Sequence, residues 1–443
     1  MASHFPGMLH VIGGGLAGVE AAWQAGKQGI PVALYEMRPE KSTPVHQTGQ
    51  LAELVCSNSF RSEAGDTAAG LLKCELERLD SLVLKAARHA RVPAGSALAV
   101  DREAFSTHIE EKLQTLQSVQ IIREERHRPP EKGVTIIATG PMTSEKMASF
   151  LMEQTGRKNL FFFDAIAPIV QADTIDREIV FLESRYGKGE GGYLNCPFSP
   201  EGYKTFYRAL VKARRIALED FDRGYLFEGC LPIEEMAERG EDTLRFGPLK
   251  PVGLRNPRDG RRPYAVVQLR QDDKAATHYS LVGFQSRLAW PEQKRVFRMI
   301  PGLARAEFVR FGTVHRNTYV NSPALLLPTY QMRANPTLFV AGQVSGVEGY
   351  MESAASGLAC GIYASRLIRD GEARPLPGAT AIGSLGRYIS TPGRARFEPM
   401  KICFGILPEP VPYIRMKRLR REKIIRDAHR SLDQWMVHEE RLS

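Results

Sequence analysis

The fold is decided by the stretch Leu9-His10-Val11-Ile12-Gly13-Gly14-Gly15-Leu16-Ala17-Gly18-Val19-Glu20. Its apolar run predicts a strand, its glycines predict a tight turn, and the residues after them follow a helical pattern. Gly13 permits the sharp turn, Gly15 lets a pyrophosphate approach the backbone, and Gly18 lets the helix pack closely on the sheet. The stretch therefore predicts a dinucleotide-binding unit. Its expected cofactor contacts are Gly13, Gly14, Gly15, Leu16, Ala17 and Gly18.

A second apolar run, residues 31–35, predicts the next strand and is followed directly by Glu36. A carboxylate about 20 residues beyond the glycines can bind the two hydroxyls of a ribose. An acidic side chain at this place disfavours a ribose that carries a 2′-phosphate. We therefore expect Glu36 to contact the ribose of the cofactor.

The glycine pattern occurs a second time, at residues 187–192, which shows that the pattern alone is weak evidence. The second match precedes Tyr193-Leu194-Asn195-Cys196-Pro197 and not a helical segment, so we interpret it as a loop on the substrate side. The first match gains support from two distant apolar runs, residues 134–140 and residues 338–343. Both runs resemble strands that return to the same sheet.

A glycine-rich loop, residues 344–350, follows the last of these strands, and a helix of small residues is predicted after it, from about 352 to 367. The N-terminus of that helix offers a second place for a phosphate or for the ribityl chain of a flavin. A cofactor held from both ends of the chain is typical of proteins that bind FAD. NAD or S-adenosylmethionine would explain the first glycines but not this closing element. The further expected contacts are Gly140, Gly342, Gln343, Gly346, Glu348, Gly349 and Tyr350.

Length and composition limit the class of protein. A chain of 443 residues predicts two or three domains. No apolar run reaches the roughly 18 residues that span a bilayer, and no secretory signal is evident, so we expect a cytoplasmic protein. The six cysteines form neither a disulfide framework nor a metal-binding cluster, and no metal site is expected. A formal charge of +10 indicates a polyanionic partner, with nucleic acid as the first candidate.

The order of the predicted elements indicates an α/β fold: a discontinuous Rossmann-like FAD-binding domain that holds an inserted α+β domain. Beyond Gly140, from about residue 161, short apolar runs alternate with turn residues. We expect the first part of the FAD-binding domain at 1–160, the insertion at 161–310, and the second part at 311–443, which ends in a basic helix around 415–430.

Two further helical segments are expected in the first part of the chain. Residues from about 67 to 91 have helical periodicity with leucines on one face. Asp101 is placed to cap a second helix over residues 102–116.

Cys56 and Cys230 stand in sequence contexts that suit thiol chemistry. Cys56 lies between an apolar run and polar, cap-forming residues, with Arg61 nearby, in a segment expected near the flavin. Cys230 follows a glycine and precedes a Leu-Pro helix start. Cations and helix N-termini both lower the pKa of a thiol. The alternative for each residue is a buried structural cysteine, and local context leaves that alternative open.

Taken together, several segments resemble the TrmFO family of folate- and FAD-dependent tRNA uridine methyltransferases. They are residues 13–18, 54–59, 227–234, 246–254, 263–271, 315–323 and 341–350, and they extend over nearly the whole chain. The glycine opening is common to many flavoproteins. The two cysteine contexts and the stretch Gly247-Pro248-Leu249-Lys250-Pro251-Val252-Gly253-Leu254 are more specific.

The resemblance implies transfer of a carbon from 5,10-methylenetetrahydrofolate, through the flavin, to C5 of uridine 54 in the tRNA T loop. Such chemistry needs a thiolate that adds to C6 of the uracil, for which we choose Cys230, and a second thiol that manages a proton or holds the activated carbon, a role that suits Cys56 near the flavin. The reverse assignment of the two cysteines stays open at the level of sequence. NAD(P)H would reduce FAD without being tightly held, because only one dinucleotide fold is visible. No membrane and no protein partner are indicated. The related GidA-type enzymes, which modify an anticodon wobble uridine, are the alternative.

Overall fold

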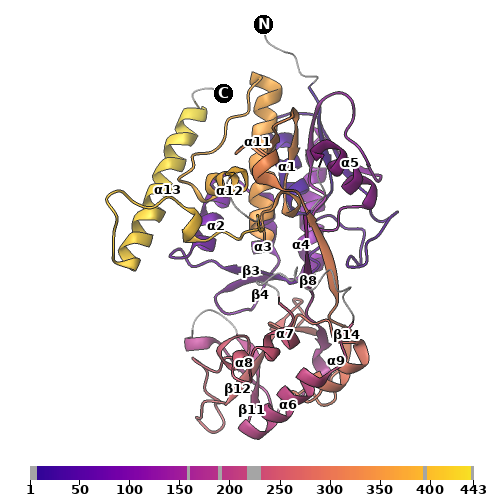
Figure 1. The fold of residues 1–443 in the computed structure, drawn as a ribbon, viewed down its shortest axis with the longest axis vertical. Coiled ribbons are helices and arrows are strands. Elements are labelled where there is room, and N and C mark those ends of the chain that lie inside the picture. Colours follow the sequence, from indigo (N-terminus) through magenta and orange to yellow (C-terminus); the bar gives the residue numbers. More distant parts are fainter. Residues whose placement is uncertain (1–6, 157–159, 188–191, 217–230, 393–396, 441–443) are drawn as a thin grey trace.

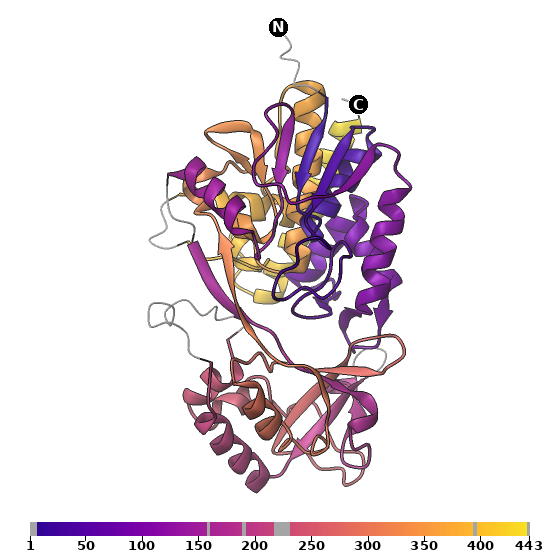
Figure 2. The same cartoon turned by 90° about the vertical axis from the view of Figure 1, so that its right-hand side faces the viewer.

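The computed structural model describes residues 7–156, 160–187, 192–216, 231–392 and 397–440. The molecule has two lobes, and both ends of the chain lie in the upper one (Figure 1). The lower lobe is formed by the middle of the chain. A two-stranded antiparallel ribbon, β8 (Leu160–Ala165) and β15 (Val314–Tyr319), runs between the lobes (Figure 2).

The upper lobe is built on a six-stranded sheet in the order β16-β17-β7-β1-β2-β6. Its strands are β1 (Leu9–Ile12), β2 (Val32–Glu36), β6 (Val119–Arg123), β7 (Val134–Ile137), β16 (Gln331–Met332) and β17 (Asn335–Val340). All neighbouring pairs are parallel except β16 with β17. Strands from both ends of the chain therefore share one sheet, as the apolar runs predicted.

Helices α1 (Leu16–Lys27) and α11 (Tyr350–Asp370) lie side by side against this sheet. They approach each other closely because α11 has glycines at the contact. A Cβ atom on Gly357 would lie 2.0 Å from the carbonyl oxygen of Ala17, and one on Gly361 would lie 2.7 Å from that of Ala21. The small residues of the closing helix thus join the two halves of the upper lobe.

Residues 67–91 are largely helical, as their periodicity predicts, but the helix is interrupted. The segment forms two helices, α2 (Ala68–Arg78) and α3 (Leu82–His89). The chain turns between them at Asp80, whose φ of 61° is left-handed. The buried carboxylate of Glu20 accepts hydrogen bonds from the backbone N–H groups at the start of α3. A periodic leucine pattern does not reveal this break, because both helices turn apolar faces toward the same core.

The other elements of the upper lobe surround the sheet. Asp101 caps the helix after it, as predicted, by accepting a hydrogen bond of 2.9 Å from the backbone N–H of Ala104. These elements are β3 (Ser59–Ser62), β4 (Arg91–Val92), β5 (Ala97–Val100), α4 (Arg102–Gln114), α5 (Glu145–Thr155), α10 (Ser322–Leu325), α12 (Ala381–Ser390) and α13 (Lys417–Glu440). None of the helices among the described residues is long and apolar enough to cross a membrane.

The lower lobe has a second six-stranded sheet, in the order β10-β11-β12-β13-β9-β14, with its own apolar core. Its strands are β9 (Ile169–Gln171), β10 (Phe181–Glu183), β11 (Tyr193–Phe198), β12 (Ala265–Gln271), β13 (His278–Leu281) and β14 (Phe308–Arg310). Its helices are α6 (Pro200–Lys212), α7 (Ile233–Glu238), α8 (Thr243–Phe246) and α9 (Trp290–Phe297). All pairings are antiparallel, so the α/β class with an inserted α+β unit is confirmed.

Candidate functional site

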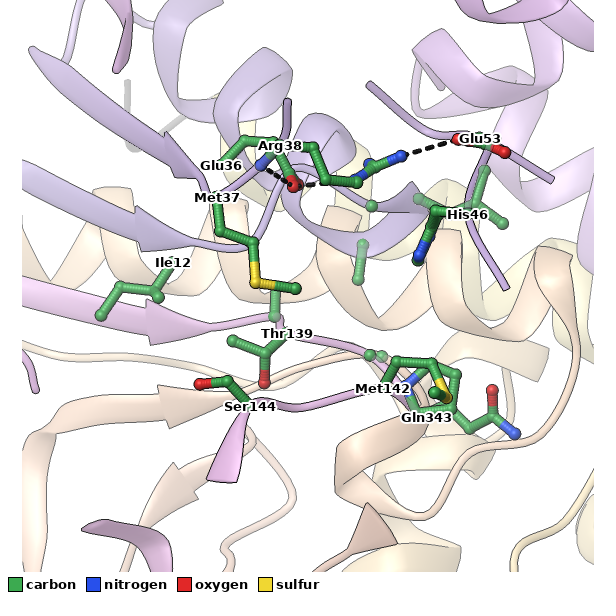
Figure 3. Close-up of a pocket in the computed structure, with 18 of the residues that line it drawn as sticks. Ile12, Glu36, Met37, Arg38, His46, Glu53, Thr139, Met142, Ser144 and Gln343 are labelled. Atoms are coloured by element: carbon green, nitrogen blue, oxygen red, sulfur yellow. Dashed lines mark hydrogen bonds and ion pairs between the residues drawn. The ribbon is translucent and has the colours of Figure 1, made fainter. Parts of the chain in front are cut away.

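A pocket opens in the upper lobe where β1, β2 and β7 end, and it holds about 1010 Å³ of empty space including its mouth (Figure 3). The carboxyl ends of parallel strands are the usual place for a nucleotide in such sheets. Of the expected cofactor contacts, the pocket is lined by Gly13, Gly15, Leu16, Ala17, Glu36, Gly140, Gly342, Gln343 and Tyr350. The two ends of the chain therefore meet at one cavity.

The three spaced glycines have distinct geometries. Gly13 has a φ of 108°, and a Cβ atom there would lie 2.5 Å from the carbonyl oxygen of Ala138. A Cβ atom on Gly18 would lie 1.8 Å from the carbonyl oxygen of Gly13, so this glycine sets the contact between helix and turn. Gly15 lines the pocket, and a Cβ atom there would meet no protein atom within 4 Å. Its open side is available to a ligand.

The remaining expected contacts lie beside the pocket and do not line it. They are Gly14, Gly18, Gly346, Glu348 and Gly349. A Cβ atom on Gly346 would lie 2.4 Å from the ring of Phe397, so this glycine accommodates an aromatic side chain. The Glu348 carboxylate accepts a hydrogen bond of 2.6 Å from the Gln343 side chain, and through it supports a residue that lines the pocket.

Glu36 belongs to a buried ionic network that the sequence did not reveal. Its carboxylate accepts hydrogen bonds from the backbone N–H of Gly14 at 2.9 Å and from Nε of Arg38 at 2.9 Å. Arg38 also reaches the Glu53 carboxylate at 2.9 Å (Figure 3). Burial acts to raise the pKa of Glu36, but Arg38 and the N–H of Gly14 outweigh burial, so the pKa lies below its usual value. Glu36 is therefore an anion that can accept hydrogen bonds.

His46 and Arg126 also line the pocket, and neither was expected there. Burial, followed by the charge of Arg38, lowers the pKa of His46 to about 4, so the imidazole is neutral near pH 7. The guanidinium of Arg126 lies 4.8 Å from the centre of the Tyr35 ring. Across the cavity from Glu36 lie Thr139, Met142 and Ser144 (Figure 3).

These residues fit FAD on structural grounds. The open side of Gly15 and the N-terminus of α1 suit a pyrophosphate, and the ionised Glu36 suits a ribose. Tyr350 and Ser353, from the start of α11, line the same cavity and are placed for the other half of the molecule. The described residues contain no group of three or more His, Cys, Asp or Glu side chains that could hold a metal ion.

Tyr350 contacts the loop that carries Cys56. Its phenol oxygen accepts hydrogen bonds of 3.0 Å from the backbone N–H of Cys56 and from that of Ser57. Burial raises the pKa of the Tyr350 phenol, which therefore stays protonated. The Sγ of Cys56 lies 3.9 Å from the carbonyl oxygen of Ala165, the last residue of β8. Cys56 thus lies between the pocket and the ribbon that joins the lobes.

Three arginines from three elements hold the Cys56 loop. Arg102, at the start of α4, donates to the carbonyl oxygen of Leu54 and pairs with Asp272. Arg270 donates to the Ser57 hydroxyl at 2.9 Å and to the Asn58 side chain at 2.7 Å. Arg310 donates to the Val55 carbonyl oxygen at 2.7 Å. Asp272 is the one carboxylate that pairs with this trio within the described part of the chain. The loop therefore lies in a field of excess positive charge.

The cation expected beside Cys56 was Arg61, and the structure gives Arg61 another partner. Its guanidinium pairs with the buried carboxylate of Glu352 in α11. The cations around the loop come instead from residues 102, 270 and 310, which are far apart in sequence. Cys230 lies outside the described residues, which resume at Leu231, just before α7.

A family model described as glucose inhibited division protein A matches residues 8–372. The enzyme named methylenetetrahydrofolate–tRNA-(uracil-5-)-methyltransferase TrmFO from Pelotomaculum thermopropionicum is 55% identical over 425 residues, which cover 96% of this chain and 97% of that one. Enzymes of the same name from Moorella thermoacetica and Listeria innocua are 55% and 54% identical over the same shares of both chains. This chain belongs to the TrmFO family.

Among solved structures, GidA from Aquifex aeolicus resembles this TrmFO chain with a TM-score of 0.69 and 17% identity, over 98% of this chain and 75% of that one. At this identity the likeness shows a shared fold. The curated relatives carry the TrmFO name, so they support the TrmFO assignment over the GidA alternative.

Proposed function

We propose that the protein transfers the methylene carbon of 5,10-methylenetetrahydrofolate to C5 of uridine 54 in the T loop of tRNA and reduces it to a methyl group. The observation that carries this proposal is 55% identity, over 96% of the chain, to enzymes named for that reaction. The pocket at the glycine turn and the loop of Cys56 beside it provide the residues for such chemistry.

FAD is the proposed cofactor of the pocket. Gly15 and the N-terminus of α1 would hold its pyrophosphate, and Glu36 would bind its adenosine ribose. Arg38 keeps the Glu36 carboxylate ionised and oriented. When bound, FAD would relay the carbon and supply the hydride that makes a methyl group. NAD(P)H is the proposed external source of electrons.

Cys230 is the proposed nucleophile, although it lies outside the described residues. Uracil C5 is a poor nucleophile until a thiolate adds at C6 and turns the ring into an enolate, which is covalent catalysis. Addition at C6 requires the target base to leave its stack, at a cost of a few kcal/mol.

Cys56 is the proposed second thiol, which manages a proton or holds the activated carbon. Its position supports this role, because Tyr350 fixes its backbone and Arg102, Arg270 and Arg310 surround its loop. Positive charge of this kind favours a thiolate over a thiol. The arginines contact the loop and not the reacting atoms, so we assign them a positioning role.

The tRNA would be held largely through its phosphates. The described part of α13 and the turn before it expose Arg415, Lys417, Arg418, Arg426 and Arg430. The lower lobe, residues 161–310, would carry the substrate, and residues 1–160 and 311–443 would form the FAD-binding domain. We propose the cytoplasm as the place of action and assign no protein partner.

The experiment is product analysis. Unmodified tRNA is incubated with the protein, NAD(P)H and methylenetetrahydrofolate whose methylene carbon is isotopically labelled, and the nucleosides are then mapped by mass spectrometry. We expect labelled 5-methyluridine at position 54. Label at the anticodon wobble uridine would favour a GidA-like reaction, and an unlabelled methyl group or no product would refute the proposal.

A further inference from the structure

An aromatic ladder reaches the surface of the lower lobe. The rings of Trp290 and Phe311 are stacked with centres 5.7 Å apart and an angle of 17° between their planes. The rings of Phe311 and Phe308 are stacked at 5.4 Å and again 17°. Trp290 is the outermost ring and is 55% exposed, although Phe311 covers one of its faces. The exposure therefore falls on the opposite face and edges of the indole.

The ladder is rigidly supported. Phe308 packs against the core of the lower lobe, with its ring centre 6.4 Å from that of the buried Phe297. The buried side chain of Gln293 in α9 donates to the carbonyl oxygen of Gly312 at 2.8 Å and accepts from its N–H at 2.7 Å. Helix α9, which carries Trp290, is thus tied to the short segment between β14 and β15 that carries Phe311. A fixed indole loses little conformational entropy when a ring stacks on it.

The ladder adjoins a residue that contacts the loop of Cys56. Phe311 directly follows Arg310, whose guanidinium binds the Val55 carbonyl in the Cys56 loop. The backbone N–H of Ile216 binds the carbonyl oxygen of Arg287, and that of Ile233 binds the carbonyl oxygen of Gln285. The described residues Ile216 and Ile233, one on each side of residues 217–230, therefore bond to the segment that leads to Trp290.

Two basic residues have backbone positions near Trp290. Lys294 is four residues after Trp290 and therefore projects from the same side of α9. The carbonyl oxygen of Arg214 binds the N–H of Ala289, directly before Trp290. Both side chains are exposed. The Glu292 carboxylate, two residues after Trp290, accepts a hydrogen bond from the backbone N–H of Arg214, interacts with the charge of Arg214 and pairs with Arg295. Trp290 therefore offers an open aromatic face with positive charge beside it.

We propose that the face of Trp290 stacks an unpaired nucleobase of the RNA substrate next to the target uridine, while Lys294 and Arg214 bind the adjoining phosphates. This inference rests on the proposed function. Aromatic faces accept any base by stacking, and a rigid aromatic beside cations is the usual arrangement for binding single-stranded nucleic acid. A base held here would keep the T loop open while its neighbour enters the site.

The test compares Trp290→Ala and Trp290→Phe with wild type for binding of unmodified tRNA at several salt concentrations. Stacking is not electrostatic, so we expect Trp290→Ala to weaken binding by roughly 10-fold at every salt concentration, with the salt slope unchanged. Trp290→Phe should restore most of the affinity. Phe246→Ala is the matched control, because Phe246 is 80% exposed in the same lobe but outside the ladder, and it should bind like wild type.

The inference would be overturned if Trp290→Ala bound tRNA as well as wild type does, or if Phe246→Ala lost as much tRNA affinity as Trp290→Ala. It would also be overturned if Trp290→Ala lost only folate affinity, because the indole would then contact the folate. Retained flavin and an unchanged melting temperature exclude a folding defect. Failure of the wild-type protein to bind or methylate tRNA would refute the proposed function itself. If the wild-type protein methylates tRNA and Trp290→Ala binds tRNA equally well, only the stacking role of Trp290 is refuted.

Discussion

Tyr350 and Cys56 are 294 residues apart in sequence, yet the Tyr350 phenol oxygen accepts a 3.0 Å hydrogen bond from the backbone N–H of Cys56. The same oxygen accepts from the N–H of Ser57. The closing loop of the nucleotide pocket is thereby joined to the loop of a proposed catalytic thiol. One side chain of the pocket wall therefore also holds the backbone beside that thiol.

Replacement of Tyr350 by Phe should separate the hydroxyl from the ring. Two backbone N–H groups would lose their acceptor, at a cost of about 1 kcal/mol each, so we expect retained FAD and methylation reduced about 10-fold. Tyr350→Ala should lose more if the ring also stacks on the flavin or the folate, as its place in the pocket wall leads us to predict. Bound flavin and turnover are measured for both variants. If Tyr350→Phe methylates tRNA at the wild-type rate, the hydrogen bonds to the Tyr350 hydroxyl do not contribute to methylation.

Gly15→Val should abolish FAD binding. The new side chain meets no protein atom near its Cβ, so the protein should fold, but it would occupy the space that a pyrophosphate needs. The ratio of flavin to protein absorbance reports the result. Gly65→Val is a matched control, since its Cβ also has no neighbour within 4 Å and Gly65 is outside the pocket wall. A yellow Gly15→Val protein would contradict the assignment of the pocket.

The basic face of α13 should give tRNA binding a steep salt dependence. Arg418 and Arg426 are exposed, so reversing both charges to Glu should remove about two phosphate contacts and lower the slope of log K against log salt by about 1.5 to 2. Reversal of Lys112 and Lys132, which are exposed elsewhere in the upper lobe, changes net charge equally and should leave the slope almost unaltered. If the two double variants have equal slopes of log K against log salt, α13 does not contact the tRNA phosphates.

The buried Glu75 should make stability depend on pH. Its carboxylate accepts hydrogen bonds from the N–H groups of Ala381 and Ile382 at the start of α12, and burial raises its pKa to about 7. A raised pKa means that the folded state favours the protonated form of Glu75. The contribution of Glu75 to the stability of the folded protein is therefore fully present below about pH 4.5 and is lost as the pH rises through 7. Wild type should lose roughly 2 to 3 kcal/mol more than Glu75→Gln in urea unfolding between pH 5 and pH 8. Parallel losses in the two proteins would contradict the assignment.

The strands and the glycine turn could be predicted because their signals are local. The apolar runs around 9–12 and 134–137, and the spaced glycines between strand and helix, each depend on neighbouring residues. The break between α2 and α3 at Asp80 could not be predicted from the sequence. A left-handed backbone at a residue other than glycine has no periodic sequence pattern, and the start of α3 after it is held by Glu20, which is distant in sequence.

The surroundings of Cys56 depend on the fold and not on local sequence. Arg102, Arg270 and Arg310 meet at one loop because the start of α4 and the ends of β12 and β14 lie at the junction of the lobes. Arg61, the cation nearest in sequence, turns to Glu352 instead. The pairing of Arg38 with Glu36 could have been predicted from the sequence, because a basic residue two positions after the ribose-binding acid is placed to pair with it.

The division of work between the two thiols is tested most directly by trapping. RNA that carries 5-fluorouridine at the target position is incubated with the FAD- and folate-loaded enzyme, and the attached peptide is sequenced. We expect a covalent adduct at Cys230, which is absent from Cys230→Ala although that variant retains FAD, and which still forms in Cys56→Ala although that variant does not methylate. Attachment at Cys56 would reverse the two roles, and attachment at neither cysteine would contradict thiol catalysis altogether.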